Sequence, residues 1–265
     1  MQGCGNDFVL LDFSKNDVPN FSAHAKKICD RRFGIGADQL LIIRPSQTAD
    51  FKMEICNADG TEAEMCGNGI RCFAKYVYEH GLTKKKDLRI ETLAGIISTG
   101  ILEGSVEVDM GEPILEGRKI PVDADGQIVD RSLTVDNVPY TVTGVSMGNP
   151  HCVVFLTHID TLDLEKIGPK FEHHSFFPKR VNAEFVQILN PQEVRMRVWE
   201  RGAGETLACG TGACAAVVAG VLTQRLRRDV TAHLTGGDLR IEWRDNNRIY
   251  MTGPAVEVFS GMVEI

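Results

Sequence analysis

The sequence predicts an α+β protein made of two similar domains, each a mostly antiparallel, barrel-like sheet around a central helix. Three observations lead to this fold class. A set of residues recurs in the same order 143 positions later, which indicates an internal duplication. Segments with strand-like alternation outnumber helical segments and do not alternate strictly with them, which favours α+β over a doubly wound sheet. The 265 residues suffice for two domains, and 43% hydrophobic residues are typical of globular proteins.

The duplication is clearest around two cysteines. Cys66 and Cys209 both stand in the pattern E-x-x-x-C-G-x-G, and several further pairs share the same offset, which is difficult to attribute to chance. The repeat predicts domains at 1–112, completed by 255–265, and at 113–254. A pseudo-twofold axis would relate them, with the active site in the cleft between them. Further matched pairs are Gly5–Asn6 with Gly148–Asn149, Gln39 with Asn182, and Asn57 with Glu200.

Each half is expected to contain strands, a glycine-containing loop and a helix in the same order. The helix of the first half should stop at Gly81, because glycine commonly ends helices. The segment 111–130, rich in Pro, Gly and Asp, is expected to cross between the domains. The predicted elements are strands at 8–12, 51–56, 88–92 and 105–110 with a helix at 68–80, then strands at 152–156, 194–199, 238–243 and 248–252 with a helix from 211 to about 225.

Charge, the start of the chain and cysteine spacing exclude several classes of function. A net charge of −7 argues against nucleic acid or an anionic membrane surface as the main partner. The start lacks the features of a signal peptide, and the longest helical apolar run is about half a membrane span, so a soluble cytoplasmic protein is expected. The eight cysteines include no C-x-x-C pair, so neither a zinc site nor a disulfide framework is predicted.

Each repeated cysteine directly precedes a predicted helix. The first N–H groups of a helix have no partner within it and bind carboxylates, and the same dipole should lower the thiol pKa below about 8.5. Two such loops facing each other would hold one carboxylate between two sulfurs, a geometry suited to moving a proton. Inert buried thiols are the plain alternative. A phosphate loop would need a lysine, and a cysteine protease using His151 and Asn149 would leave the second cysteine loop without a purpose.

Two long segments around these cysteines resemble the signatures of the diaminopimelate epimerase family. They are NADGTEAEMCGNGIRC at 57–72 and ERGAGETLACGTG at 200–212, and the resemblance extends over nearly the whole chain. It implies interconversion of LL- and meso-diaminopimelate, on the route to lysine and peptidoglycan, by a homodimer that uses neither a cofactor such as pyridoxal phosphate nor a metal. The start of the chain implies that part of the family's first strand is missing. Supporting segments are GNDF at 5–8, GIGADQ at 34–39, MGNPH at 147–151 and VNAEF at 181–185.

The resemblance also implies roles for individual residues. Cys66 and Cys209 would be the base and acid on the two faces of the α-carbon, and His151 and Glu200 would tune their protonation. The backbone at Gly67–Asn68 and at Gly210–Thr211 would bind the reacting carboxylate. Phe259 would lie at the dimer contact. The rest of the substrate would be held by Asn6, Gln39, Asn57, Asn149, Asn182, Glu200 and Arg201.

Two other functions remain open from the sequence. A proline racemase-like enzyme would keep both thiols but act on a cyclic amino acid, which leaves Asn57, Asn182 and Arg201 without a distal group to bind. Arg201 suits a second carboxylate, because a guanidinium can bind one with two parallel hydrogen bonds. A thiol-redox or metal-binding module would need no substrate at all.

Overall fold

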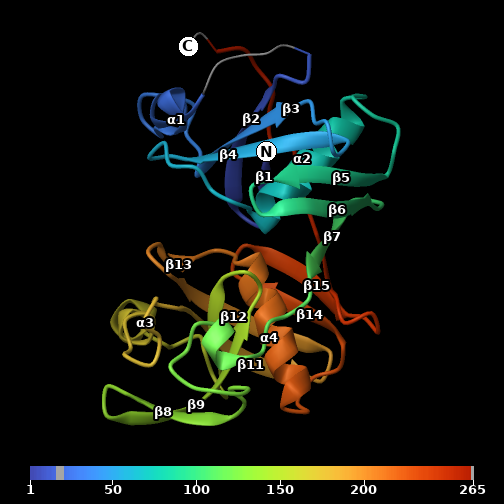
Figure 1. The fold of residues 1–265 in the computed structure, drawn as a ribbon. Helices are drawn as coiled ribbons and strands as arrows, with labels where there is room; N and C mark the ends of the chain where they lie inside the picture. The colour runs from blue at the N-terminus through green and yellow to red at the C-terminus, as the bar shows by residue number, and fades with distance from the viewer. Residues whose placement is uncertain (16–20, 264–265) are drawn as a thin grey trace. The chain divides into compact units, whose positions relative to one another are not determined.

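The computed structural model describes residues 1–15 and 21–263 and confirms an α+β fold (Figure 1). Two compact units are defined by their internal contacts, Met1–Asp109 with Thr252–Ile265 and Met110–Met251. Domains are predicted at 1–112 with 255–265 and at 113–254. That each of these ranges folds as a domain stays a prediction. No helix among the described residues is long and apolar enough to span a membrane.

The described residues of the first unit form a mostly antiparallel sheet and two helices. Strand β2 pairs in parallel with β3, and β4 pairs in parallel with β5, while the remaining neighbours are antiparallel. Helix α2 contacts strands from both parts of this sheet, including β1, β2, β3 and β6. The elements are β1 (Gln2–Gly3), β2 (Asn6–Asp12), α1 (Ser22–Cys29), β3 (Gln39–Arg44), β4 (Phe51–Asn57), α2 (Gly67–Glu79), β5 (Asp87–Thr92), β6 (Gly95–Ile101) and β7 (Val106–Gly111).

The second unit repeats this plan. Strand β10 pairs in parallel with β11, β11 is antiparallel to β12, β12 is parallel to β14 and β14 is antiparallel to β15. Helix α4 contacts β9, β10, β11 and β15. The elements are η1 (Gly117–Lys119), β8 (Arg131–Val135), β9 (Val138–Ser146), β10 (Pro150–Phe155), α3 (Leu164–Glu172), β11 (Asn182–Asn190), β12 (Glu193–Glu200), β13 (Gly204–Thr206), α4 (Gly210–Leu222), β14 (Asp229–Leu234), β15 (Gly237–Trp243) and β16 (Ile249–Gly253).

Strand register confirms the internal duplication at the level of single residues. Phe8 pairs with Gln39 between β2 and β3, and His151 pairs with Asn182 between β10 and β11. Both members of the second pair lie 143 positions after those of the first. Because a shift of one residue would turn every side chain to the other face of the sheet, the shared register places equivalent side chains on equivalent faces.

The two central helices begin where the repeat predicts them. Helix α2 is followed by His80 and by Gly81 at a φ of +71°, as the stop signal predicts. Helix α4 is buried along most of its length, from Gly210 to Gly220. Its predicted end near residue 225 is wrong: Gln224 has a φ of 58° and the Arg225 N–H donates to the Gly220 carbonyl, so the helix stops at Leu222.

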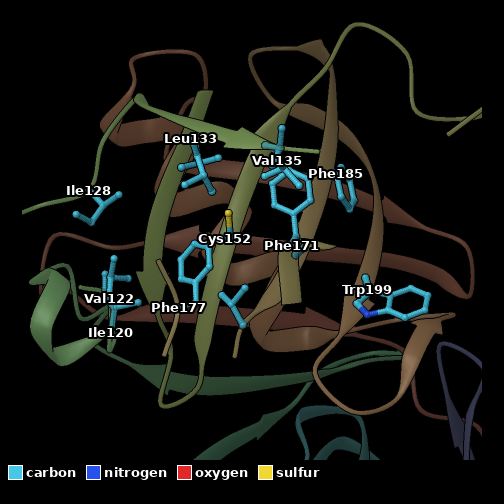
Figure 2. Close-up of a cluster of buried hydrophobic side chains, with 14 of the residues drawn as sticks. Ile120, Val122, Ile128, Leu133, Val135, Cys152, Phe171, Phe177, Phe185 and Trp199 are labelled. Atoms are coloured by element: carbon cyan, nitrogen blue, oxygen red, sulfur yellow. The ribbon is translucent and has the colours of Figure 1, made fainter. Parts of the chain in front are cut away.

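The segment 111–130 does more than lead from one unit to the next. It belongs to the second unit, and Ile120, Val122 and Ile128 are buried in its core. In Figure 2 these side chains stand in one cluster with Phe171 and Phe177. Pro, Gly and Asp mark the turns of this segment correctly, but three apolar residues between the turns bind it to the core.

Candidate active site

The predicted site residues lie in both units. The first carries the Cys66 loop and the second the Cys209 loop. Phe259 lies on the last described segment and is 66% exposed. The first unit contains Asn6, Gln39, Asn57, Cys66, Gly67 and Asn68, and the second contains Asn149, His151, Asn182, Glu200, Arg201, Cys209, Gly210 and Thr211.

Both cysteines cap their helices in the same way. Each has an extended backbone, and each sulfur accepts a hydrogen bond from the N–H of the third residue after it, at 3.4 Å from Gly69 N to Cys66 and at 3.3 Å from Gly212 N to Cys209. This is the geometry of an N-cap side chain, which satisfies one of the helix N–H groups. The thiols therefore stand at the two positive helix ends, as the repeat predicts.

Asn6 connects the Cys66 thiol to the neighbouring strand. Its Oδ1 accepts from the Cys66 thiol at 3.5 Å and from Asn68 Nδ2 at 3.4 Å. Its Nδ2 donates to Asp38 Oδ2 at 2.8 Å, and Arg31 in turn binds Asp38. Asp38 thereby fixes which end of the Asn6 amide faces the sulfur.

Gln39 and Asn57 lie opposite each other on β3 and β4 and form one polar pair. Gln39 Nε2 donates to Asn57 Oδ1 at 2.8 Å, and Asn57 Nδ2 donates to the Thr61 hydroxyl at 3.0 Å. Gln39 Oε1 is a buried acceptor without a hydrogen-bond partner among the described residues. A buried acceptor left unpaired is costly, so this oxygen suits a ligand N–H group.

The Cys209 thiol is more deeply buried, 5% exposed, and is surrounded by acidic groups. Burial raises its pKa well above the ordinary value, and the carboxyl groups of Glu200 and Glu184 raise it further. Hydrogen bonds from Thr211 and from Gly212 N lower the pKa but do not compensate. The expected lowering of this thiol pKa by the helix dipole is therefore wrong: desolvation disfavours the thiolate more than the helix end stabilises it.

Glu200 acts on this thiol through its charge. Its carboxyl group raises the pKa of the Cys209 thiol, and the Thr206 hydroxyl donates to Glu200 Oε1 at 2.5 Å. Burial raises the pKa of the Glu200 carboxyl. Burial thus shifts the pKa of both groups upwards, which suits a site that holds a proton for transfer.

His151 lies on β10 and is fully buried. Its Nδ1 is 2.7 Å from Glu184 Oε1, and its Nε2 is 3.0 Å from Asn149 Oδ1. Asn149 Nδ2 donates to the Thr211 hydroxyl at 3.2 Å, and this hydroxyl lies 3.5 Å from the Cys209 sulfur. The predicted residues Asn149, His151 and Thr211 are therefore joined in one chain of contacts that ends at the thiol.

Asn182 holds the backbone on both sides of the site, while the Arg201 side chain is exposed. Asn182 Nδ2 donates to the Pro150 carbonyl at 2.8 Å, and its Oδ1 accepts from Arg201 N at 2.9 Å. The Arg201 guanidinium donates to the Lys179 carbonyl at 3.2 Å. Asn182 therefore uses its amide to shape the backbone, and the exposed guanidinium remains able to meet a ligand.

Four further residues that support the site were not singled out from the sequence. Glu184 is the one that its position could have revealed, because it is a charged residue between the apolar Ala183 and Phe185 in a buried stretch of β11. Buried Arg71 donates to the Gly67 carbonyl and to Asn68 Oδ1, which supports the Cys66 loop from below. Glu172 accepts from Trp199 Nε1 and Gly202 N and so anchors the loop that carries Arg201. The fourth is Asp38, whose role comes from its contact with Asn6, a residue far from it in the sequence.

The other two cysteines near these loops, Cys72 and Cys214, are packing residues. Cys72 and Cys214 lie within α2 and α4 and are fully buried. Burial raises the pKa of Cys72 to about 12, so this thiol stays protonated. Within 1–15 and 21–263, no group of three or more His, Cys, Asp or Glu side chains is arranged to hold a metal ion.

Comparison with known proteins extends over the whole chain. Residues 1–116 and 143–258 match the family model of diaminopimelate epimerase. The diaminopimelate epimerase of Desulfitobacterium hafniense is 52% identical over 99% of this chain and 96% of its own length. That of Moorella thermoacetica is 55% identical over 98% of this chain and 96% of its own length.

Solved structures share the fold at low sequence identity. A phenazine biosynthesis protein of the PhzF family from Bacillus anthracis aligns with a TM-score of 0.71 at 17% identity, covering 100% of this chain and 95% of its own. A hydroxyproline epimerase from Agrobacterium vitis aligns with a TM-score of 0.64 at 14% identity, covering 96% and 86%. The family model and the full-length relatives show what the fold alone could not: this chain belongs to the diaminopimelate epimerase family and is an isomerase.

Proposed function

We propose that the chain interconverts LL- and meso-diaminopimelate by moving a proton at the α-carbon between Cys66 and Cys209. The observation that carries this proposal is the pair of cysteine N-caps, which have the same backbone geometry and the same sulfur contact in both repeats. A mechanism with a single reactive thiol would not need the motif twice. A proton transfer on opposite faces of one carbon does need it twice, because one sulfur must remove the proton and the other must return one.

The proton balance can be written from a state in which Cys209 is protonated. The raised pKa of Cys209 suits this thiol to be the proton donor, and Cys66 is the thiolate base once it has lost the proton that it donates to Asn6 Oδ1. Cys66 takes the α-proton, the electron pair stays on the substrate, and Cys209 delivers its proton to the other face. The enzyme is then left with a Cys66 thiol and a Cys209 thiolate, which is the state needed for the reverse reaction.

The helix ends supply the electrostatic part of the reaction. The N–H groups at Gly67–Asn68 and Gly210–Thr211 belong to the first turns of α2 and α4. Such groups bind a carboxylate and stabilise the negative charge that develops when the α-proton leaves. No electron-withdrawing cofactor is required in this scheme, because the N–H groups that bind the carboxylate stabilise the developing charge and the two thiols move the proton.

The distal half of diaminopimelate carries an ammonium group and a second carboxylate. The unpartnered Gln39 Oε1 suits the ammonium, and the exposed Arg201 guanidinium suits the carboxylate. Asn57 orients Gln39, and Asn182 orients the backbone of Arg201. A cyclic substrate such as proline would leave these groups unused.

A comparison of two substrates tests this function. Purified protein, dialysed against a chelator and given no cofactor, is incubated separately with LL-diaminopimelate and with L-proline, and the products are separated by chiral chromatography. We expect meso-diaminopimelate from the first and no D-proline from the second. Racemisation of proline without turnover of diaminopimelate would assign the site to the cyclic alternative. No turnover of either would favour the thiol-redox or metal-binding alternative.

We also propose that the protein works as a cytoplasmic homodimer. Phe259 and its neighbour Val258 are 66% and 64% exposed, which is unusual for two adjacent large apolar side chains and suits a contact with a second copy. Sedimentation of the protein with Phe259→Asp should show monomers where the unchanged protein shows dimers.

A further inference from the structure

A basic and an acidic residue, His151 and Glu184, are both fully buried beneath the Cys209 loop. Both side chains are 0% exposed, and the distance between His151 Nδ1 and Glu184 Oε1 is 2.7 Å. The second carboxyl oxygen of Glu184 is buried and has no hydrogen-bond partner among the described residues. Because an incompletely bonded buried carboxyl group is costly, the fold alone gives no reason to keep one here.

The loop is built tightly around this carboxyl group. A Cβ atom placed on Gly212 would stand 2.8 Å from Glu184 Oε1, closer than such atoms approach each other. The second glycine of the C-G-x-G pattern therefore makes room for Glu184. Glu184 lies below the N-terminus of α4, beside the cysteine cap.

The first repeat offers an apolar counterpart at the same positions. Phe8 and Leu41 stand 143 residues before His151 and Glu184, and both are buried. A Cβ on Gly69 would meet Leu41 Cδ2 and Phe8 Cε1, each at 3.3 Å. The same space below the same loop is thus filled by hydrocarbon in one repeat and by a carboxyl–imidazole pair in the other. The polar pair is therefore not required by this arrangement of strands and helix.

Hydrogen-bond direction shows what the pair does. Oxygen acceptors face both ring nitrogens of His151, so Nε2 must carry a hydrogen for Asn149 Oδ1, and one more proton must lie between Nδ1 and Glu184 Oε1. Asn149 Nδ2 then donates to the Thr211 oxygen. The Thr211 hydroxyl hydrogen is left to point at the Cys209 sulfur, 3.5 Å away.

We propose that Glu184 is a positioning residue: it fixes the ring and the protonation of His151 and thereby orients Asn149 and Thr211 so that the Thr211 hydroxyl donates to Cys209 when this sulfur is a thiolate. The inference rests on the proposed function, in which Cys209 alternates between thiol and thiolate. It makes the two half-sites chemically different, since the Phe8–Leu41 pair can order no such chain.

The test replaces Glu184 with Gln, which keeps the size of the side chain and can still hydrogen-bond but cannot exchange a proton with the imidazole or carry a charge. The first readout is the ¹⁵N–¹H NMR signal of His151. We expect a slowly exchanging Nε2–H in the unchanged protein and loss or averaging of this signal in Glu184→Gln. This readout needs no turnover, so it judges the positioning role even if diaminopimelate proves not to be the substrate.

The second readout is kinetic. Loss of a charged hydrogen bond should lower kcat by roughly ten- to a hundred-fold, while KM for LL-diaminopimelate stays within a few-fold. An unchanged Nε2–H signal together with kcat within two-fold of the original would overturn the proposal.

The matched variant copies the first repeat into the second. His151→Phe combined with Glu184→Leu should keep or raise the thermal midpoint, because buried ion pairs are often replaced by apolar residues without loss of stability. It should nevertheless lose turnover. A folded double variant with the original kcat would contradict a role for the pair in the reaction.

Discussion

Cys66 and Cys209 each combine a structural contact with a proposed chemical role. Each sulfur accepts a hydrogen bond from a helix N–H group, and each is a proposed proton carrier. The two roles can be separated experimentally, because an N-cap contributes only about 1 kcal/mol to stability whereas a missing acid or base typically costs 10²–10⁴ in rate.

Substituting either cysteine with Ala should therefore abolish epimerisation and lower the thermal midpoint only slightly. Turnover of LL-diaminopimelate and thermal unfolding are measured on the same preparations. Cys72→Ala is the matched control, because this thiol is buried in α2 and its pKa is raised to about 12. A Cys66→Ala or Cys209→Ala protein that retains full turnover would exclude the two-thiol scheme.

The sequence predicts the cysteines and their glycines but not the acids that support them. The C-G-x-G pattern is local, and its repetition at one offset makes it visible. Glu184 acts on His151 across two strands whose register only the folded structure gives. The direction of the Cys209 pKa was mispredicted for the same reason, because burial and two carboxyl groups from other strands outweigh the helix end.

Helices α2 and α4 follow the same sequence rule at their starts and differ in what lies beneath them. The cysteine, the following glycines and the apolar run predict both starts. The end of α4 is predicted too late because the left-handed residue that ends it, Gln224, is neither glycine nor asparagine. The core residues of segment 111–130 are missed because they are isolated among turn-forming ones. Local signals thus define where both helices begin and where α2 ends, whereas the end of α4 carries no such signal.

Gly69→Ala and Gly212→Ala form a matched pair of variants for this element. Alanine favours helices over glycine by about 0.5–1 kcal/mol, so propensity alone would stabilise both proteins equally. At Gly69 the new Cβ meets two hydrocarbon atoms at 3.3 Å, whereas at Gly212 it meets Glu184 Oε1 at 2.8 Å and the Cys209 sulfur at 3.2 Å. We expect Gly212→Ala to have the lower thermal midpoint and the lower kcat. Equal losses in the two variants would show that the carboxyl group does not constrain the loop.

The whole molecule is a duplicated fold. Its two halves share a backbone arrangement but differ in the side chains around the two cysteines. The repeated register gives two cysteines at equivalent helix ends, which a two-faced proton transfer needs. The side chains below those helix ends, Phe8 and Leu41 against His151 and Glu184, give the two sulfurs different surroundings. The duplication and the family were predictable from the sequence, while this difference between the half-sites required the structure.

Solvent-deuterium labelling tests the two-thiol epimerase most directly. LL-diaminopimelate is incubated in D₂O with the unchanged protein and no added cofactor, and both isomers are analysed by mass spectrometry at early conversion. Because one thiol removes the α-proton and the other delivers a solvent-derived deuteron, the meso product should carry deuterium at the inverted carbon while the recovered LL substrate stays largely protiated. Protium retained in the product, or equal early labelling of both isomers, would indicate a single base and contradict the account.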